Sequence, residues 1–113
     1  MSLALRRADF FLGDFARQYQ WYLAEAGETI ARRYLDAVWQ TLEELAARPG
    51  LGRRRRFRHP SLQQLRSFRV RPPFDVHLIF YRYTDQELLV ERLMSGRRNL
   101  ARRLHEPPGS AAT

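Results

Sequence analysis

Three histidines, His59, His77 and His105, are the side chains of this sequence best suited to moving protons near neutral pH. The unperturbed pKa of histidine is about 6.5, so an imidazole can act as a general acid or base. Their scattered positions do not form a metal-ligand motif, and the chain has no cysteine to complete one. The sequence also has no glycine-rich phosphate loop and no nucleophilic-serine turn, so we expect neither a metal nor a cofactor.

Arginine supplies a second kind of chemistry, because its guanidinium binds phosphate and carboxylate through paired hydrogen bonds. All 20 basic residues are arginines, and the 12 acidic residues leave a net charge of +8. This excess predicts attraction to nucleic acid or to an acidic protein. The densest group lies in GRRRRFRHP (52–60), which we expect to be an exposed loop. The loop is either merely solvated or a contact surface formed by Arg53, Arg54, Arg55, Arg56 and Arg58.

The bulk composition is that of one small globular domain. The chain has 113 residues, of which 44% are hydrophobic and 28% charged. We expect no signal peptide and no membrane span, because no apolar run is suitable for either, and the missing cysteines are compatible with the reducing cytoplasm. We expect residues 1–105 to form one domain and EPPGSAAT (106–113) to be a disordered tail.

Two segments carry apolar residues at helical spacing. The first has them at Phe11, Phe15, Tyr19, Tyr22 and Ala26, and the second at Ile30, Tyr34, Val38, Thr41 and Leu45. Asp9 is suited to cap the first helix, Gly27 to end it, and Pro49 to stop the second. The short link predicts an antiparallel helical hairpin. Trp21 and Trp39 lie off the main apolar faces and would anchor a partner if exposed.

The remaining segments have the pattern of strands. Residues 3–7 form a short first candidate, and residues 65–70, 76–83 and 87–94 follow the helices, separated by short turns. VHLIFYRY (76–83) is nearly apolar on both faces, as a central strand is. The predicted fold is therefore α+β, with the order β-α-α-β-β-β. A helical hairpin packs on one face of a small antiparallel sheet, in a two-layer sandwich.

Over about residues 3 to 104, this order resembles the RelE/ParE toxin superfamily of bacterial type II toxin–antitoxin systems, in its ParE-like branch. ARRYLDAVWQTLEELAARPGLG (31–52) resembles the second helix of the family and its exit. LRSFRV (65–70), VHLIFYRY (76–83) and VERLMSGRRN (90–99) resemble the three strands that follow. The chain departs from the family at Ser95, where many members have histidine, and at Asn99, where an acidic residue is common.

The resemblance implies one of two activities. RelE-like members cleave mRNA in the ribosomal A site, whereas ParE-like members bind and inhibit DNA gyrase. RNA cleavage requires cations on the scissile phosphate and groups that transfer protons. Matched residue by residue, Arg69 and Arg71 correspond to a basic pair of the nuclease branch, and Arg97 or Arg98 to its late arginine. His77 lies near the position of the central-strand arginine.

The sequence offers few residues that could transfer the protons in RNA cleavage. The tyrosine of the nuclease branch falls near Leu104, and only the adjacent His105 offers a replacement. Arginine stays protonated at any working pH, so it binds phosphate but is a poor acid or base. We expect His77 to be a structural, hydrogen-bonded residue of an apolar strand. Between the two activities that the resemblance implies, the residues therefore favour the ParE-like one, a toxin that would bind gyrase rather than act as an enzyme.

Two alternatives stay open from the sequence. One is a ribosome-dependent endoribonuclease that would use Arg69, Arg71, His77, Arg97 and His105; the other is an inactive or purely binding relative. In each case the resemblance implies a cognate antitoxin, whose acidic segment would fold onto the basic toxin. The partner-binding candidates are Arg53, Arg54, Arg55, Arg56, Arg58, Arg69, Arg71, Arg97 and Arg98.

Overall fold

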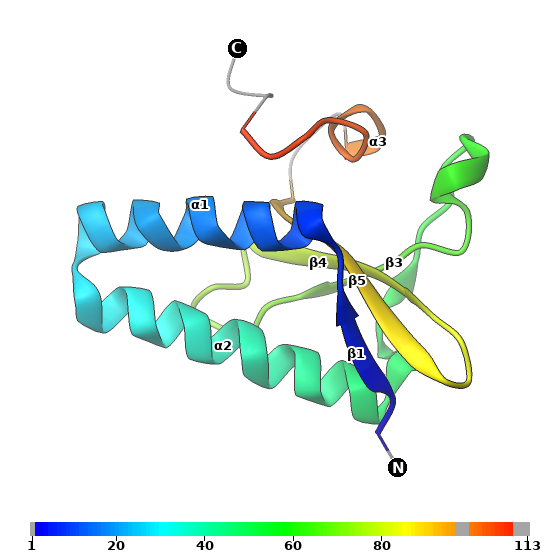
Figure 1. The fold of residues 1–113 in the computed structure, drawn as a ribbon, viewed down its shortest axis with the longest axis horizontal. Helices are drawn as coiled ribbons and strands as arrows, with labels where there is room; N and C mark the ends of the chain where they lie inside the picture. Colours follow the sequence, from blue (N-terminus) through cyan, green and yellow to red (C-terminus); the bar gives the residue numbers. More distant parts are fainter. Residues whose placement is uncertain (1, 97–99, 110–113) are drawn as a thin grey trace.

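Two long antiparallel helices form one layer of the protein and a five-stranded sheet forms the other (Figure 1). A computed structural model describes residues 2–96 and 100–109. The main elements are β1 (Ala4–Arg7), α1 (Asp9–Ala26), α2 (Glu28–Ala47), β2 (Arg53–Arg54), β3 (Arg66–Arg69), β4 (His77–Tyr83), β5 (Glu87–Ser95) and α3 (Leu100–Arg103). Short 3-10 turns at Pro49–Leu51 and Pro60–Leu62 flank the arginine-rich segment.

The predicted helical hairpin is confirmed. Gly27 joins the two helices with φ of 89°, a conformation that favours glycine. One end differs from the prediction, because Ala8 is the N-cap of α1 and Asp9 is the first helical residue. The sheet fixes this start: the Ala8 N–H donates to the Val90 carbonyl of β5, so the chain enters the helix directly from a strand pairing.

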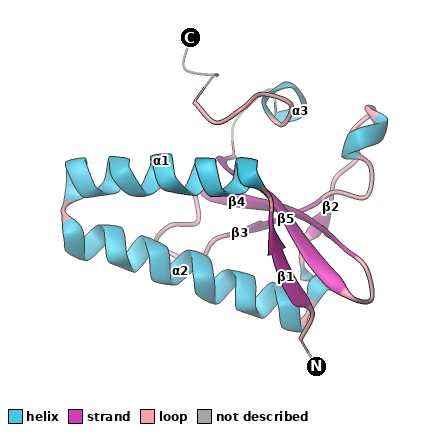
Figure 2. Cartoon of the chain, viewed as in Figure 1, coloured by secondary structure: helices cyan, strands magenta, loops and turns pink. Residues whose placement is uncertain are grey.

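The sheet has the order β1-β5-β4-β3-β2 (Figure 2). The predicted antiparallel meander of β3, β4 and β5 is confirmed. The sheet is mixed, however, because β1 runs parallel to β5, from Ala4 opposite Glu87 to Arg7 opposite Val90. Arg53–Arg54, which we expected in a loop, forms a fifth strand at the far edge. Arg53 and Arg54 lack the apolar alternation that indicates a strand, so the sequence did not predict this one. Short, charged strands are nevertheless typical of sheet edges.

Both faces of the sheet are covered. On the helix side, Tyr34, Val38 and Leu42 of α2 pack in the main core with Ile79 and Tyr81 of β4. On the other side a second, smaller core contains Leu62, Leu65, Leu78, Phe80, Met94 and Leu104. The segment after β2 and the C-terminal segment supply this second cover, which the two-layer prediction lacked.

More of the C-terminal segment has a defined position than we expected. Residues 106–109 were predicted to belong to a disordered tail, but the Glu106 carbonyl accepts a hydrogen bond of 2.6 Å from Arg92. Pro108 also packs against Gly13 of α1, since a Cβ added at Gly13 would lie 2.8 Å from the proline ring. Residues 110–113 lie outside the described part of the chain.

Candidate partner-binding surfaces

The arginine-rich segment lies along the free edge of the sheet. Arg53 is opposite Ser67 and Arg54 is opposite Arg66, and the Arg55 N–H extends the ladder by donating to the Leu65 carbonyl at 2.9 Å. Arg53, Arg54, Arg56 and Arg58 are exposed. The segment is therefore an ordered, extended edge that presents four cationic side chains, rather than the simple loop that its charge suggested.

Arg55 differs from these four, because its guanidinium is partly buried and anchors the segment. Its Nη1 donates to Ser67 Oγ at 3.2 Å, and its Cζ lies 5.9 Å from the ring centroids of Phe57 and of Phe80. Burial, and secondarily the charge of Arg53, lowers the pKa of Arg55. Arg55 holds the edge to the second core, whereas its neighbours remain available to a partner.

Arg69 and Arg71 form a separate group at the opposite end of β3. Arg69 Nη1 donates to the Asp75 carbonyl at 2.7 Å. The Arg71 guanidinium lies 3.9 Å from Glu44 of α2, and its backbone N–H donates to Thr41 Oγ1 at 3.2 Å. Both side chains remain exposed. Arg97 and Arg98, the other arginines proposed for binding, lie outside the described residues.

His77 is buried under the helices. Its Nε2 lies 2.9 Å from the Tyr22 hydroxyl, and the Tyr34 ring packs against its imidazole at 5.2 Å between centroids. Burial lowers the pKa of His77 to about 4, so the ring is neutral at physiological pH. This environment is that of a structural histidine, as the apolar strand suggested.

Lowering the pH from 7.5 to 5 should therefore destabilise the wild type by about 2 kcal/mol more than a His77→Gln variant. Below pH 6.5 His77 becomes protonated in the unfolded chain, whereas in the folded chain it stays neutral down to about pH 4. Stability from the neutral imidazole is thus present above pH 6.5 and is lost as the pH falls. Urea unfolding at both pH values measures the difference; identical pH dependence of the two proteins would contradict it.

His105 lies on the other face of the sheet, beside the second core. Its ring contacts that of His59 with 4.5 Å between centroids, and His59 Nδ1 accepts a hydrogen bond from the Ser61 N–H. The sheet therefore separates His105 from His77, and neither imidazole is hydrogen bonded to Arg69 or Arg71 among the described contacts. Within residues 2–96 and 100–109, no three His, Cys, Asp or Glu side chains are grouped to hold a metal ion.

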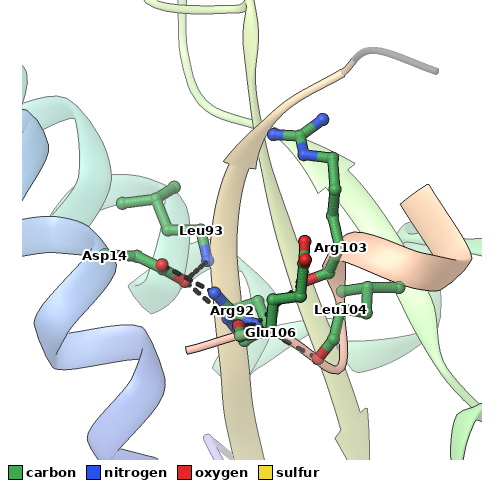
Figure 3. A network of polar contacts seen from close by, with 6 residues as sticks. All are labelled: Asp14, Arg92, Leu93, Arg103, Leu104 and Glu106. Atoms are coloured by element: carbon green, nitrogen blue, oxygen red, sulfur yellow. Dashed lines mark hydrogen bonds and ion pairs between the residues drawn. The ribbon is translucent and has the colours of Figure 1, made fainter. Parts of the chain in front are cut away.

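A buried ion pair that sequence analysis missed joins α1, β5 and the C-terminal segment (Figure 3). Arg92 Nε and Nη2 donate to the two Asp14 carboxylate oxygens at 2.7 and 2.9 Å. Arg92 Nη1 reaches the carbonyls of Arg103, Leu104 and Glu106. The only local signal was a charged residue within the apolar run ELLVERLM (87–94). Its partner stands 78 positions earlier, which no local pattern reveals.

Beside this network a groove of about 740 Å³ runs between α1, the second half of β5 and the C-terminal segment. Trp21 lines the groove and is 56% exposed, while Arg17 and Arg103 add positive charge. Trp39 is different: it stacks on Phe15 at 5.6 Å and lies under the Arg7 guanidinium. Of the two tryptophans, Trp21 alone has the exposed position expected of a partner anchor.

A helical hairpin on a small mixed sheet, with a basic edge on one side and a groove beside Trp21 on the other, defines a small protein of the α+β class. Comparison with known families makes the class specific. The chain belongs to the ParE toxin family of type II toxin–antitoxin systems, whose family model (ParE toxin of type II toxin-antitoxin system, parDE) matches residues 6–100. Among the described residues, none of the helices has the length and apolarity needed to cross a membrane.

Individual relatives agree with this assignment. The chain is 30% identical over 92 residues to Toxin ParE3 of Caulobacter vibrioides, and the match covers 81% of this chain and 85% of the relative. Its fold is similar to a solved chain of the chromosomal ParDE toxin–antitoxin system from P. aeruginosa, with a TM-score of 0.66. That similarity covers 83% of this chain and 96% of the other at 15% identity, so it bears on the fold alone.

Proposed function

We propose that this ParE-family toxin arrests bacterial growth by binding and inhibiting DNA gyrase in the cytoplasm, and that it acts by binding rather than by catalysis. The observation that supports this choice is that His77 and His105, the two candidate proton-transfer residues, lie on opposite faces of the sheet, and that neither is hydrogen bonded to Arg69 or Arg71 among the described contacts. His77 is buried against Tyr22 on the helix side, and His105 lies beside His59 on the other side. RNA cleavage needs an acid and a base that each reach, within hydrogen-bond distance, the proton that they transfer at one scissile phosphate.

Supercoiling by purified gyrase tests the proposal directly. We expect inhibition that rises with toxin concentration, together with growth arrest and a DNA-damage response when the toxin is expressed without its antitoxin. Transcripts cut on translating ribosomes, with cutting lost on changing Arg69 or Arg71, would replace the proposal with the endoribonuclease alternative. Normal growth on expression would instead indicate an inactive or purely binding relative.

We further propose that a cognate antitoxin keeps the toxin inactive by occupying the groove beside Trp21. The groove combines an exposed aromatic ring with the positive charges of Arg17 and Arg103, whereas its two carboxylates, Asp14 and Glu106, are paired with Arg92 and Arg102. An acidic, amphipathic segment that folds on binding is complementary to both features. Interfaces of this kind derive much of their affinity from a few aromatic anchors at the centre of the contact.

Trp21→Ala is therefore expected to weaken antitoxin binding by about 30-fold, since loss of an aromatic anchor costs about 2 kcal/mol or more. Isothermal titration with the neighbouring gene's product would measure the change. Val76→Ala is the control, because Val76 is 51% exposed but does not line the groove. Unchanged affinity in the Trp21 variant would place the antitoxin on another surface.

A further inference from the structure

The positive charge of this toxin is concentrated in one continuous part of the chain. Residues 45–74 contain nine arginines and no aspartate or glutamate, whereas the rest of the chain has eleven arginines against twelve acidic residues. The whole net charge of +8 therefore arises from residues 45–74, and the remainder is almost neutral. A preference for arginine over lysine along the whole chain would not by itself produce this segregation.

Local carboxylates do not neutralise the edge formed by this segment. Within the described residues, no ion pair involves Arg53, Arg54, Arg56 or Arg58. Among the ion pairs of the described residues, Glu44 alone supplies a carboxylate to residues 45–74, and it is shared between Arg48 at 3.0 Å and Arg71 at 3.9 Å. Unpaired, exposed guanidinium groups retain their full capacity for an outside anion.

The edge is also shaped to receive an anion. A hollow of about 350 Å³ is lined by Arg54, Arg55, Arg56, Phe57, Gln63 and Gln64, without a carboxylate. Arg54 Nη2 lies 3.5 Å from Gln64 Oε1, and Gln64 itself has φ of 71°, a left-handed conformation uncommon for glutamine. Arg55, one of the lining residues, is held in place by its contacts with Ser67 and Phe80. Arginine guanidinium groups and glutamine amides thus surround the same hollow.

We propose that this edge, formed by Arg53, Arg54, Arg56 and Arg58 around the hollow, is a binding site for the phosphodiester backbone of nucleic acid, independent of base sequence. Arginine forks match phosphate oxygens, and a row of them releases counterions from a polyanion. A charged edge strand also prevents pairing between exposed sheets, but that role requires charge on β2 alone. Arg56 and Arg58 lie beyond the strand, so the charge extends further than edge protection needs.

Nucleic acid fits this edge better than an acidic protein does. Protein interfaces have an apolar centre, whereas nucleic-acid interfaces are more polar and strongly positive. Phe57 is the one aromatic residue among the described residues that line the hollow, and it is already packed against Arg55 and the second core. Trp21, the most exposed aromatic residue among those described, lies in the other groove. The two surfaces therefore suit partners of different chemistry.

Fluorescence anisotropy of the purified toxin with labelled nucleic acid tests this site. The probes are a mixed-sequence DNA duplex of two helical turns and a single-stranded RNA of similar length, each titrated over a range of salt. The variant replaces the four exposed side chains and keeps the anchoring Arg55: Arg53→Ala, Arg54→Ala, Arg56→Ala and Arg58→Ala. The matched control removes the same charge from other exposed positions: Arg6→Ala, Arg32→Ala, Arg33→Ala and Arg102→Ala.

We expect the edge variant to bind at least about tenfold more weakly, with a log–log salt slope smaller by about 3 to 4, because each lost phosphate contact removes about 0.9 from the slope on duplex DNA. The control should retain most of the affinity. A second variant with lysine at the same four positions keeps the charge and should keep the salt slope, which guards against a folding defect in the alanine variant.

Several results would overturn the proposal. Equal loss in the edge variant and in the control would mean that net charge alone attracts the probe. Binding of polyglutamate without binding of either nucleic acid would assign the edge to an acidic protein partner. Binding of DNA or of RNA with the expected loss in the edge variant would instead support the proposal, and a preference between the two would identify which source supplies the backbone. Because these titrations contain no gyrase, they stand or fall independently of the supercoiling assay.

Discussion

Asp14→Ala is expected to destabilise the protein by about 3–5 kcal/mol, because it leaves the buried Arg92 guanidinium without a carboxylate. The side chains of Arg92 and Asp14 are only 5% and 8% exposed, so water cannot replace the lost partner. The substitution also removes the acceptor of the Leu93 N–H, which donates to Asp14 Oδ2 at 3.0 Å. Urea unfolding at neutral pH measures the loss.

Glu25→Ala provides the matched control, since it removes an exposed carboxylate from the same helix. Its expected effect is within about 0.5 kcal/mol, as for most surface substitutions. An equally small effect of Asp14→Ala would show that the ion pair contributes little.

The double variant Asp14→Leu, Arg92→Met distinguishes the contribution of the network to global stability from its role in fixing the C-terminal segment. Replacing a whole buried pair by apolar side chains is often neutral, so much of the lost stability should return. The carbonyls of Arg103, Leu104 and Glu106 would still lack their donor, however. We therefore expect trypsin to cut after Arg102 and Arg103 faster in the double variant than in the wild type, even where global stability is recovered.

The helices and the central strands were predictable because each has a continuous local pattern. The apolar spacing from Phe11 to Ala26 and from Ile30 to Leu45 predicted both helices, and the apolar run ending at Tyr83 predicted the central strand. The direction of β1 was not predictable in the same way. Its pairing with β5 is formed across more than 80 positions, and no property of residues 4–7 specifies a parallel partner.

The candidate surfaces were predictable only in part, for a related reason. Residue type identified the arginines at 53–58 and the structural environment of His77, because charge and strand hydrophobicity are local properties. The role of Arg55 as an anchor depends on Ser67 and Phe80, which reach it only through sheet pairing. The groove at Trp21 likewise exists only where α1, β5 and the C-terminal segment meet.

Gly52→Ala is expected to cost about 3 kcal/mol or more, from overpacking and from lost hydrogen bonds. The φ of Gly52 is −67°, which any residue can adopt, so space rather than conformation requires the glycine. An added Cβ would clash with the Tyr81 hydroxyl and lie 2.6 Å from Tyr81 Cε1. That hydroxyl accepts from the Gly52 N–H at 2.8 Å and donates to the Pro49 carbonyl at 2.6 Å.

Gly50→Ala is the matched control, because its Cβ would meet only Tyr83 Oη at 3.8 Å, an ordinary contact. In a Tyr81→Phe background the Gly52 substitution should cost about 1 kcal/mol less, since the closest clashing atom is gone.

Gly52 directly precedes β2, so a clash there must also displace the strand that carries Arg53 and Arg54. Gly52→Ala should therefore weaken nucleic-acid binding as well, although no charge is removed. Full stability and full binding in this variant would mean that the Tyr81 hydroxyl does not position the arginine edge.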